Sequence, residues 1–273
     1  LMRENLFMKS AKSWERNSGA SSWAKGLAAM LFAFVALGGA GCEVPVRWEG
    51  VPFATSTAAT GQEPGPSWQE IEPGIERLDA RIVAADAAAR LVVWRFSSAS
   101  PWEWSLATST EPHTVSHWVD ASTATVFAVN AGYFHADGLP SGWVQMQGAR
   151  WGARMFDAKR SGIVHLGIQP DLLFGETPTS TLREDAFQSY PWLIRGGEQV
   201  FAQETGQYAR RTFVGTDTEG RWYVGVVPSE SVTLFQLAHL LRALPVQWMH
   251  ALNLDGGPST GLVTKSGRQE DRF

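Results

Sequence analysis

The chain has 273 residues, a formal net charge of −4 and one cysteine. Because it has no basic stripe, it has no electrostatic footprint for nucleic acid, and we expect no nucleic-acid partner. A single cysteine also excludes a disulfide within the chain, so its stability must come from packing.

Residues 1–41 have the pattern of an export signal. A net basic start precedes an uncharged run of sixteen residues, 26–41. That run is short for a membrane span, which needs about 20 apolar residues, and it suits the core of a secretory signal. Cys42 follows directly, which predicts a bacterial lipoprotein whose lipidated Cys42 anchors the chain to the cell envelope. Ordinary cleavage near residues 38–40 is the alternative.

Two regions follow the signal. Residues 42–67 are rich in Thr, Ser, Ala, Gly and Pro, and their low apolar content predicts a disordered tether. Residues 68–273 have the length of one domain, on a prior of ~100–200 residues. We therefore expect a single globular domain after the tether.

Short strand-like segments dominate this domain. Turn residues separate paired apolar runs, which predicts hairpins for residues 80–85 with 91–96 and for residues 212–217 with 221–227. Residues 126–130 have the pattern of a buried strand that Ala-Gly ends. Further strand candidates are residues 142–147, 162–168 and 192–194.

One segment predicts a helix. Thr233 and Gln236 fit a capping box, in which each side chain satisfies a free backbone N–H group of the other residue. Apolar residues then recur on one face at helical spacing as far as Leu244, and Pro245 ends the segment. Many strands with one or two packed helices predict an α+β fold, with a mixed, largely antiparallel sheet in a single domain.

Thirteen tryptophans are many for this length. An aromatic face packs well against a sugar ring, but tryptophan is first a large core residue, so core packing is the default interpretation. Trp102 and Trp104, in the loop-like stretch SASPWEWS, are the pair most suggestive of sugar binding.

Residues 257–261 (GPSTG) satisfy the G-x-S-x-G pattern of the α/β-hydrolase nucleophile elbow. That fold needs an acid and a histidine after the serine, and none of the fourteen residues after Ser259 is histidine. A Ser259 hydrolase activated by an earlier histidine is a weaker alternative. No phosphate-loop or HExxH pattern is present, so we expect neither a cofactor nor a metal; His135 with Asp137 at most suggests a bound cation.

Two apolar strands end on a polar residue close to glycine: VFAVN ends at Asn130, and ALNLD ends at Asp255. Glycine lets the backbone turn sharply or approach a ligand, and polar tips at one sheet edge form a site on a rigid frame. Two unrelated turns, each with an Asx-type bond, are the alternative. Arg195 and Arg211 lie near strand ends, and guanidinium groups bind phosphate or carboxylate through a planar fork.

Six blocks of sequence resemble the phosphodiester glycosidase family in order and approximate spacing. They are NAGYF (130–134), SGW (141–143), YPWLIRGG (190–197), RRTFVGTDTEGRWYVGVV (210–227), the TLFQLAHLL helix and ALNLDGGPST (251–260). The resemblance runs from about Arg77 to the C-terminus. Two positions depart from the family pattern: Pro258 stands where members often have another glycine or small residue, and Ala131 where they often have glycine.

The resemblance implies cleavage of a sugar C1–O bond whose leaving group is a phosphate ester. The family includes the lysosomal enzyme that removes N-acetylglucosamine from a phosphodiester on mannose. A glycosidase ordinarily uses one carboxylic acid on the leaving oxygen and a second carboxylate on the ring side. A departing phosphate monoester is already a stable anion, with a second pKa near ~6, so one carboxylate and an arginine suffice. The implied substrate is an envelope or extracellular carbohydrate phosphodiester.

On this hypothesis Asp255, Arg211 and Asn130 form the catalytic set. Asp255 stabilises the oxocarbenium-like centre or acts as base or nucleophile, while Arg211 and an anion nest of backbone N–H groups hold the phosphate. The other expected contacts to phosphate or sugar are Gly256, Gly257, Ser259, Thr260, Thr212, Arg195, Tyr133 and Phe134. The alternative from another class is a non-catalytic phosphoglycan-binding module of the envelope, which would bind the diester without turnover.

Overall fold

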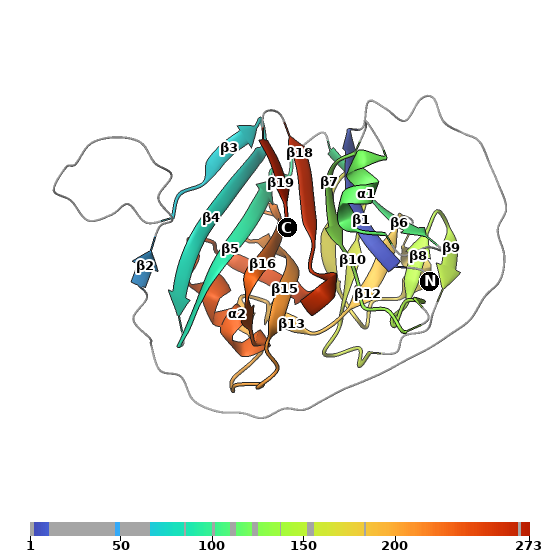
Figure 1. Ribbon diagram of the computed structural model, residues 1–273. Helices are drawn as coiled ribbons and strands as arrows, with labels where there is room; N and C mark the ends of the chain where they lie inside the picture. Colours follow the sequence, from blue (N-terminus) through green and yellow to red (C-terminus); the bar gives the residue numbers. More distant parts are fainter. Residues whose placement is uncertain are drawn as a thin grey trace.

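The computed structural model describes these residues: 3–10, 47–49, 66–84, 86–99, 102–109, 113–121, 125–136, 138–151, 156–182, 184–266 and 269–273. They form three sheets and two short α-helices (Figure 1). Cys42 and most of the predicted signal and tether lie outside these residues. Among the residues described, no helix is both long and apolar enough to cross a membrane.

The largest sheet has nine strands. Its order is β14 (Glu198–Gln199), β13 (Trp192–Arg195), β17 (Trp248–Asn253), β15 (Ala209–Asp217), β16 (Trp222–Val232), β5 (Ala87–Phe96), β4 (Ile75–Ala84) and β2 (Arg47–Glu49), with β3 (Gln69–Glu72) also paired to β4. Both predicted hairpins are confirmed, because β4 pairs with β5 and β15 pairs with β16. Asp86 makes the first turn possible with a φ of 61°.

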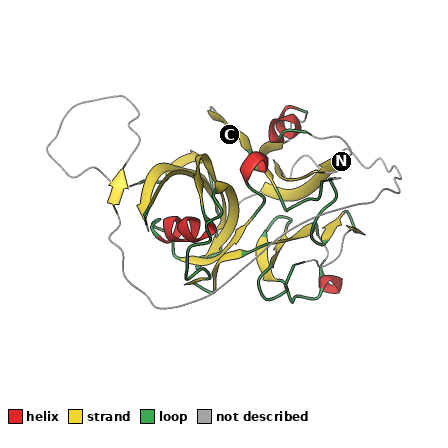
Figure 2. Ribbon diagram, turned by 60° about the horizontal axis from the view of Figure 1, so that its bottom comes forward, coloured by secondary structure: helices red, strands yellow, loops and turns green. Residues whose placement is uncertain are grey.

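The helix α2 (Leu234–Arg242) lies on the concave side of this sheet (Figure 2). Its predicted capping box is present: the Gln236 N–H donates to Thr233 Oγ1 at 3.1 Å, and the Thr233 N–H donates to Gln236 Oε1 at 3.0 Å. The helix contacts β4 and β13, which lie towards opposite edges of the sheet. The sheet therefore curves around the buried apolar face of α2.

The two smaller sheets have five strands each. One has the order β19 (Gln269–Arg272), β18 (Leu262–Ser266), β7 (Thr125–Asn130), β1 (Arg3–Ser10) and β6 (Trp102–Ser109), and α1 (Val115–Asp120) packs on β7 and β18. The other has the order β11 (Asp171–Phe174), β10 (Gly162–His165), β12 (Ala186–Ser189), β8 (Val144–Met146) and β9 (Ala149–Trp151). Short 3-10 helices span Thr179–Thr181 and Gly257–Ser259.

Two predictions about these elements need correction. The described strands form three sheets instead of one, and every pairing among them is antiparallel, so the largely antiparallel part of the predicted fold holds and the mixed part does not. Sheets also dominate, so α+β describes the fold only approximately. Trp102 and Trp104 belong to β6, because this stretch pairs with β1 as regular strand instead of forming a loop.

An aromatic core fills the space between the sheets. Phe96 and Trp104 meet edge to face, with ring centroids 5.0 Å apart, and Phe127 lies 5.4 Å from Phe96. Each of these side chains is at most 3% exposed. The core interpretation is therefore confirmed for Trp104, and this packing fixes the frame on which the strand ends stand.

Candidate active site

The ends of three strands meet at one place. Asn130 is the last residue of β7 and Asn253 the last of β17, while Arg211 lies near the start of β15. In the antiparallel pair of β15 and β17, Phe213 lies opposite Asn253, and the Leu254 N–H donates to the Thr212 carbonyl at 2.9 Å. This register puts Arg211 and Asp255 at the same end of the two strands.

The side chain of Asn130 joins three segments of chain. Its Nδ2 donates to the Asp255 carbonyl at 2.8 Å, and its Oδ1 accepts from Thr212 Oγ1 at 2.7 Å and from the Gly261 N–H at 3.1 Å. Asn130 is 5% exposed and Thr212 is fully buried. The side chains of Asn130 and Thr212, which the sequence analysis assigned to substrate, therefore bond to each other and to the backbone. In the structure these two residues position the backbone of Asp255.

Each of the two positions after Asp255 requires glycine for a different structural reason. A Cβ atom at Gly256 would lie 2.6 Å from the Arg210 carbonyl oxygen, so only glycine allows this close approach. Gly257 has a φ of 61°, which L side chains rarely adopt. The Gly256 N–H donates to Asp255 Oδ1 at 2.8 Å. The predicted anion nest consists of the Gly256 and Gly257 N–H groups. Because the Gly256 N–H already donates to Asp255, it orients the carboxylate and is not available to the nest.

Arg211 is a buried cation held by backbone carbonyls. Its Nε donates to the Val232 carbonyl at 2.9 Å and its Nη2 to the Gln207 carbonyl, while the residue is only 7% exposed. Burial lowers the pKa of Arg211, although a guanidinium keeps its charge at neutral pH. Among the residues that the structure describes, no carboxylate forms an ion pair with Arg211. A buried charge is costly without an opposite charge, and the described residues offer Arg211 only carbonyl oxygens as partners.

Tyr133 contacts the end of β17. Its hydroxyl oxygen accepts a hydrogen bond from Asn253 Nδ2. Burial raises the pKa of Tyr133 well above its ordinary value, the negative charge of Asp255 adds to this, and Arg211 opposes it. Asn253 lies opposite Phe213 in the pair of β17 and β15, so its bond to Tyr133 puts the phenol at the strand end where Arg211 and Asp255 stand. The structure thus brings Tyr133 to the strand end that carries Asp255, Arg211 and Asn130.

Asn253 is a site residue that sequence reasoning missed. It is fully buried, and its Nδ2 also contacts the Leu254 carbonyl at 2.7 Å and the Tyr190 carbonyl at 3.3 Å. A signal was present, because a polar residue two positions before Asp255 shares its face of the strand.

An aromatic group next to Tyr133 was also missed. Phe156 lies 5.9 Å from the Tyr133 ring, edge to face, and stacks on Tyr190 with centroids 5.5 Å apart. The guanidinium carbon of Arg160 lies 5.6 Å from the Tyr190 ring centroid. Phe156 and Arg160 lie outside the six sequence blocks, whereas Tyr190 begins the YPWLIRGG block. Phe156 and Tyr190 give the site an apolar wall.

The remaining predicted residues differ in their placement. Ser259, half-buried, donates its N–H to the Gly256 carbonyl at 3.2 Å. Thr260 is 5% exposed, and its hydroxyl has no hydrogen-bond partner among the residues described. Phe134, half-buried, forms an isolated bridge with Pro140, which directly precedes the SGW block. The contacts to substrate that the sequence predicts for these three residues therefore stay predictions.

Arg195 lies away from this group. It pairs with His250 across β13 and β17, and His250 precedes Asp255 by five positions. At ~3.3 Å per residue the separation along the strand is about 16 Å. Its Nη1 donates to the Lys159 carbonyl at 2.7 Å, and its Nη2 lies 3.7 Å from Glu176. The prediction that Arg195 is a second phosphate contact therefore finds no support in this geometry.

Comparisons with known proteins agree with this architecture. Residues 123–272 match the model of the family described as phosphodiester glycosidase. The catalytic domain of zebrafish N-acetylglucosamine-1-phosphodiester alpha-N-acetylglucosaminidase, auto-inhibited by its pro-peptide, is 18% identical with a TM-score of 0.52, over 76% of this chain and 77% of that chain. A hypothetical protein from Synechocystis is 15% identical with a TM-score of 0.46, over 73% of this chain and 59% of that chain. No curated protein matches.

Proposed function

We propose that this chain, which belongs to the phosphodiester glycosidase family, hydrolyses the C1–O bond of a sugar-1-phosphodiester and releases a sugar and a phosphomonoester. The observation that carries the proposal is the buried guanidinium of Arg211, which has two carbonyl partners, no ion pair within the described residues, and Asp255 at the same end of the paired strands. One fixed cation and one carboxylate around the same phenol are what this reaction needs.

Arg211 neutralises the leaving group. A phosphate monoester departs as an anion with a second pKa near ~6, so it needs charge stabilisation more than a proton. The Val232 and Gln207 carbonyls hold the guanidinium in place before substrate arrives. Such a preorganised charge in a buried site loses little energy to reorganisation during the reaction.

Asp255 acts at the anomeric carbon. The bond from the Gly256 N–H fixes the orientation of the Asp255 carboxylate. Asn130 holds the Asp255 carbonyl, so the carboxylate stands on a rigid strand end. We assign Asp255 the stabilisation of the oxocarbenium-like centre.

Tyr133 donates its phenolic proton as a hydrogen bond to the phosphate. The Asn253 amide already donates to its oxygen, so the hydroxyl hydrogen points elsewhere. The raised pKa keeps Tyr133 protonated throughout the physiological range. The wall formed by Phe156 and Tyr190 then receives the apolar face of the sugar.

An isotope experiment tests the bond that breaks. The purified chain is given a sugar-1-phosphodiester in water enriched in oxygen-18. Cleavage of C1–O puts the label on the sugar, whereas cleavage of P–O puts it on the phosphate. Asp255→Asn and Arg211→Ala are each expected to lose at least ~10²-fold in kcat, and the exposed Arg242→Ala serves as the control. Label on the phosphate, or full activity in both variants, refutes the proposal.

We also propose export and lipid anchoring at Cys42. Cleavage after residue 41 would remove residues 3–10, which form β1 between β6 and β7. A mature chain therefore cannot both begin at a lipidated Cys42 and contain strand β1. Mass spectrometry of the membrane fraction decides between them: a lipid-modified peptide that begins at Cys42 supports export, and a chain that keeps residues 3–10 refutes cleavage.

A further inference from the structure

We propose a second site, which binds neutral saccharide, at the opposite end of β15 and β17 from Asp255. A cavity of about 510 Å³ opens there between the end of β5, the start of β6, the β15–β16 turn, the start of β17 and the segment before β11. His250 lines it, five positions and about 16 Å along the strand from Asp255 at ~3.3 Å per residue. This site does not depend on the proposed reaction.

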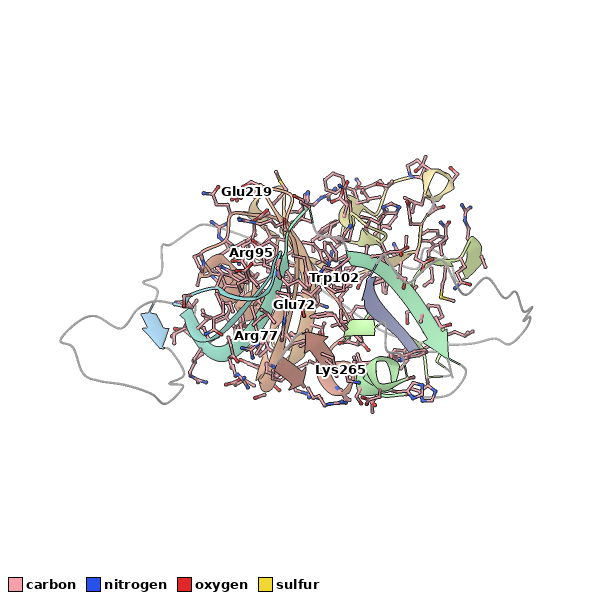
Figure 3. All side chains as sticks on the ribbon, turned by 90° about the horizontal axis from the view of Figure 1, so that it is seen from above. Glu72, Arg77, Arg95, Trp102, Glu219 and Lys265 are labelled. Carbon is pink, nitrogen blue, oxygen red and sulfur yellow. The ribbon has the colours of Figure 1, made fainter. Side chains whose placement is uncertain are left out.

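The cavity has an aromatic floor. Phe96 and Trp222 lie opposite each other on β5 and β16, and Trp104 packs edge to face on Phe96. These three side chains are at most 3% exposed, so the floor is rigid and has little area for a ligand. Trp102, labelled in Figure 3, is only partly buried and lies at the start of β6. Its indole is therefore the ring with area left for a ligand.

Polar groups stand at the rim. Asp171 is exposed, and its Oδ1 accepts the Leu172 N–H at 2.7 Å, which leaves Oδ2 to accept from a ligand. His250 Nδ1 accepts the Gly196 N–H at 3.1 Å. Burial lowers the pKa of His250 against the opposing effect of Asp171, so the ring is neutral and carries its hydrogen on Nε2. The rim thus has an acceptor and a donor.

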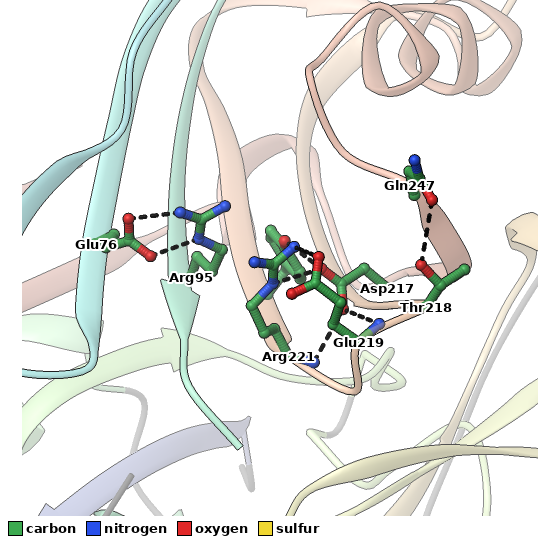
Figure 4. Close-up of polar contacts among 8 residues, drawn as sticks. Glu76, Arg95, Asp217, Thr218, Glu219, Arg221 and Gln247 are labelled. Atoms are coloured by element: carbon green, nitrogen blue, oxygen red, sulfur yellow. Dashed lines mark hydrogen bonds and ion pairs between the residues drawn. The ribbon is translucent and has the colours of Figure 1, made fainter. Parts of the chain in front are cut away.

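The charge of the lining excludes an anion. Among the described residues that line the cavity none is Lys or Arg, whereas two carboxylates, Asp171 and Asp217, are present. The nearest arginine in the β15–β16 turn is already paired, because Arg221 Nε donates to Asp217 Oδ2 at 2.6 Å and its Nη2 to Glu219 at 2.8 Å (Figure 4). Arg195, which lies opposite His250 across β13 and β17, donates to the Lys159 carbonyl and lies 3.7 Å from Glu176. A phosphodiester therefore meets no uncompensated cation here among the described residues.

A neutral sugar ring suits all three features. Its C–H face packs on the indole of Trp102, and its hydroxyl groups donate to Asp171 and accept from His250. The volume lies within the ~300–1,000 Å³ of small-molecule sites. The neighbouring Ile168, which is 60% exposed, and Met249, which is 39% exposed, extend the apolar surface at the rim. A saccharide of more than one unit would contact both.

Calorimetric titration of the whole chain tests the site. The probes are chitotriose and maltotriose as neutral saccharides, glucose-1-phosphate as an anion, and tetramethylammonium as a cation. We expect at least one neutral trisaccharide to bind below about 10 mM, and neither ion to do so. No binding by either trisaccharide, or binding by an ion in their place, overturns the proposal.

Matched variants locate the binding. Trp102→Ala and Asp171→Asn should each weaken trisaccharide binding roughly tenfold, and Trp118→Ala on α1 is the control for loss of a tryptophan elsewhere. Asp171 is exposed, so its variant tests the site even where Trp102→Ala fails to fold. Asp255→Asn must leave the affinity unchanged, and Asp171→Asn must leave hydrolysis of a small diester unchanged. Unchanged affinity in Asp171→Asn and Trp102→Ala refutes this location, whatever the chain does to diesters.

Discussion

Replacing Arg211 by Met separates the function of this residue from its effect on stability. The change removes two charge-assisted hydrogen bonds to the Val232 and Gln207 carbonyls, at ~1.5–3 kcal/mol each. It also removes the desolvation penalty of a charge that is 7% exposed, which is several kcal/mol in the opposite direction. We therefore expect the free energy of unfolding without anion to change by less than about 2 kcal/mol.

The same variant should lose all stabilisation by phosphate. If Arg211 binds the anion, inorganic phosphate at 100 times its Kd raises the free energy of unfolding of the unmodified chain by about 2.7 kcal/mol. In Arg211→Met this increase should be absent. The assay is urea unfolding, followed by tryptophan fluorescence, with and without phosphate, and sulfate of the same ionic strength tests for general salt effects. An equal increase in both chains would show that phosphate binds elsewhere and refute the reasoning.

Three further predictions concern other residues of the frame and the site. Gly257→Ala should destabilise the chain by about 1 kcal/mol because the φ of Gly257 is 61°. Gly256→Ala should destabilise it more and displace Asp255, since the added Cβ would lie 2.6 Å from the Arg210 carbonyl oxygen. Thermal unfolding and kcat are measured for both variants, and equal effects would contradict this difference. Tyr133→Phe should lower kcat most for diesters with poor leaving groups, and a loss that does not depend on the leaving group would rule out a hydrogen bond to the phosphate. Burial opposes the low pKa of Asp217, but hydrogen bonds from Tyr223 and Arg221 outweigh it. Because a lowered pKa stabilises the folded chain above the unfolded value of ~3.9, Asp217→Asn should be less stable than the unmodified chain at pH 7. The stabilities of the two chains should converge as the pH falls below about 4, and Glu219→Gln is the control.

Local sequence patterns were sufficient to predict features that depend on residues close together in the sequence. The capping box of Thr233 and Gln236 uses residues three apart, and the turn at Asp86 uses neighbours, so both were predictable. The stretch of Trp102 and Trp104 was not, because its pairing partner β1 lies far away in the sequence and no local pattern marks a strand there. Strand pairing between distant segments overrides local preference.

The sequence by itself determined that Asp255 stands at a strand end before two glycines, and that an arginine pair begins another strand. It could not decide which polar groups face inwards. Tertiary structure alone joined Asn253 to Tyr133 across 120 positions, used the amide of Asn130 inside the frame, and left Arg195 about 16 Å from Asp255 at ~3.3 Å per residue. The reason is that side-chain partners follow from strand register and sheet curvature, which arise from packing between segments that spacing along the chain does not relate.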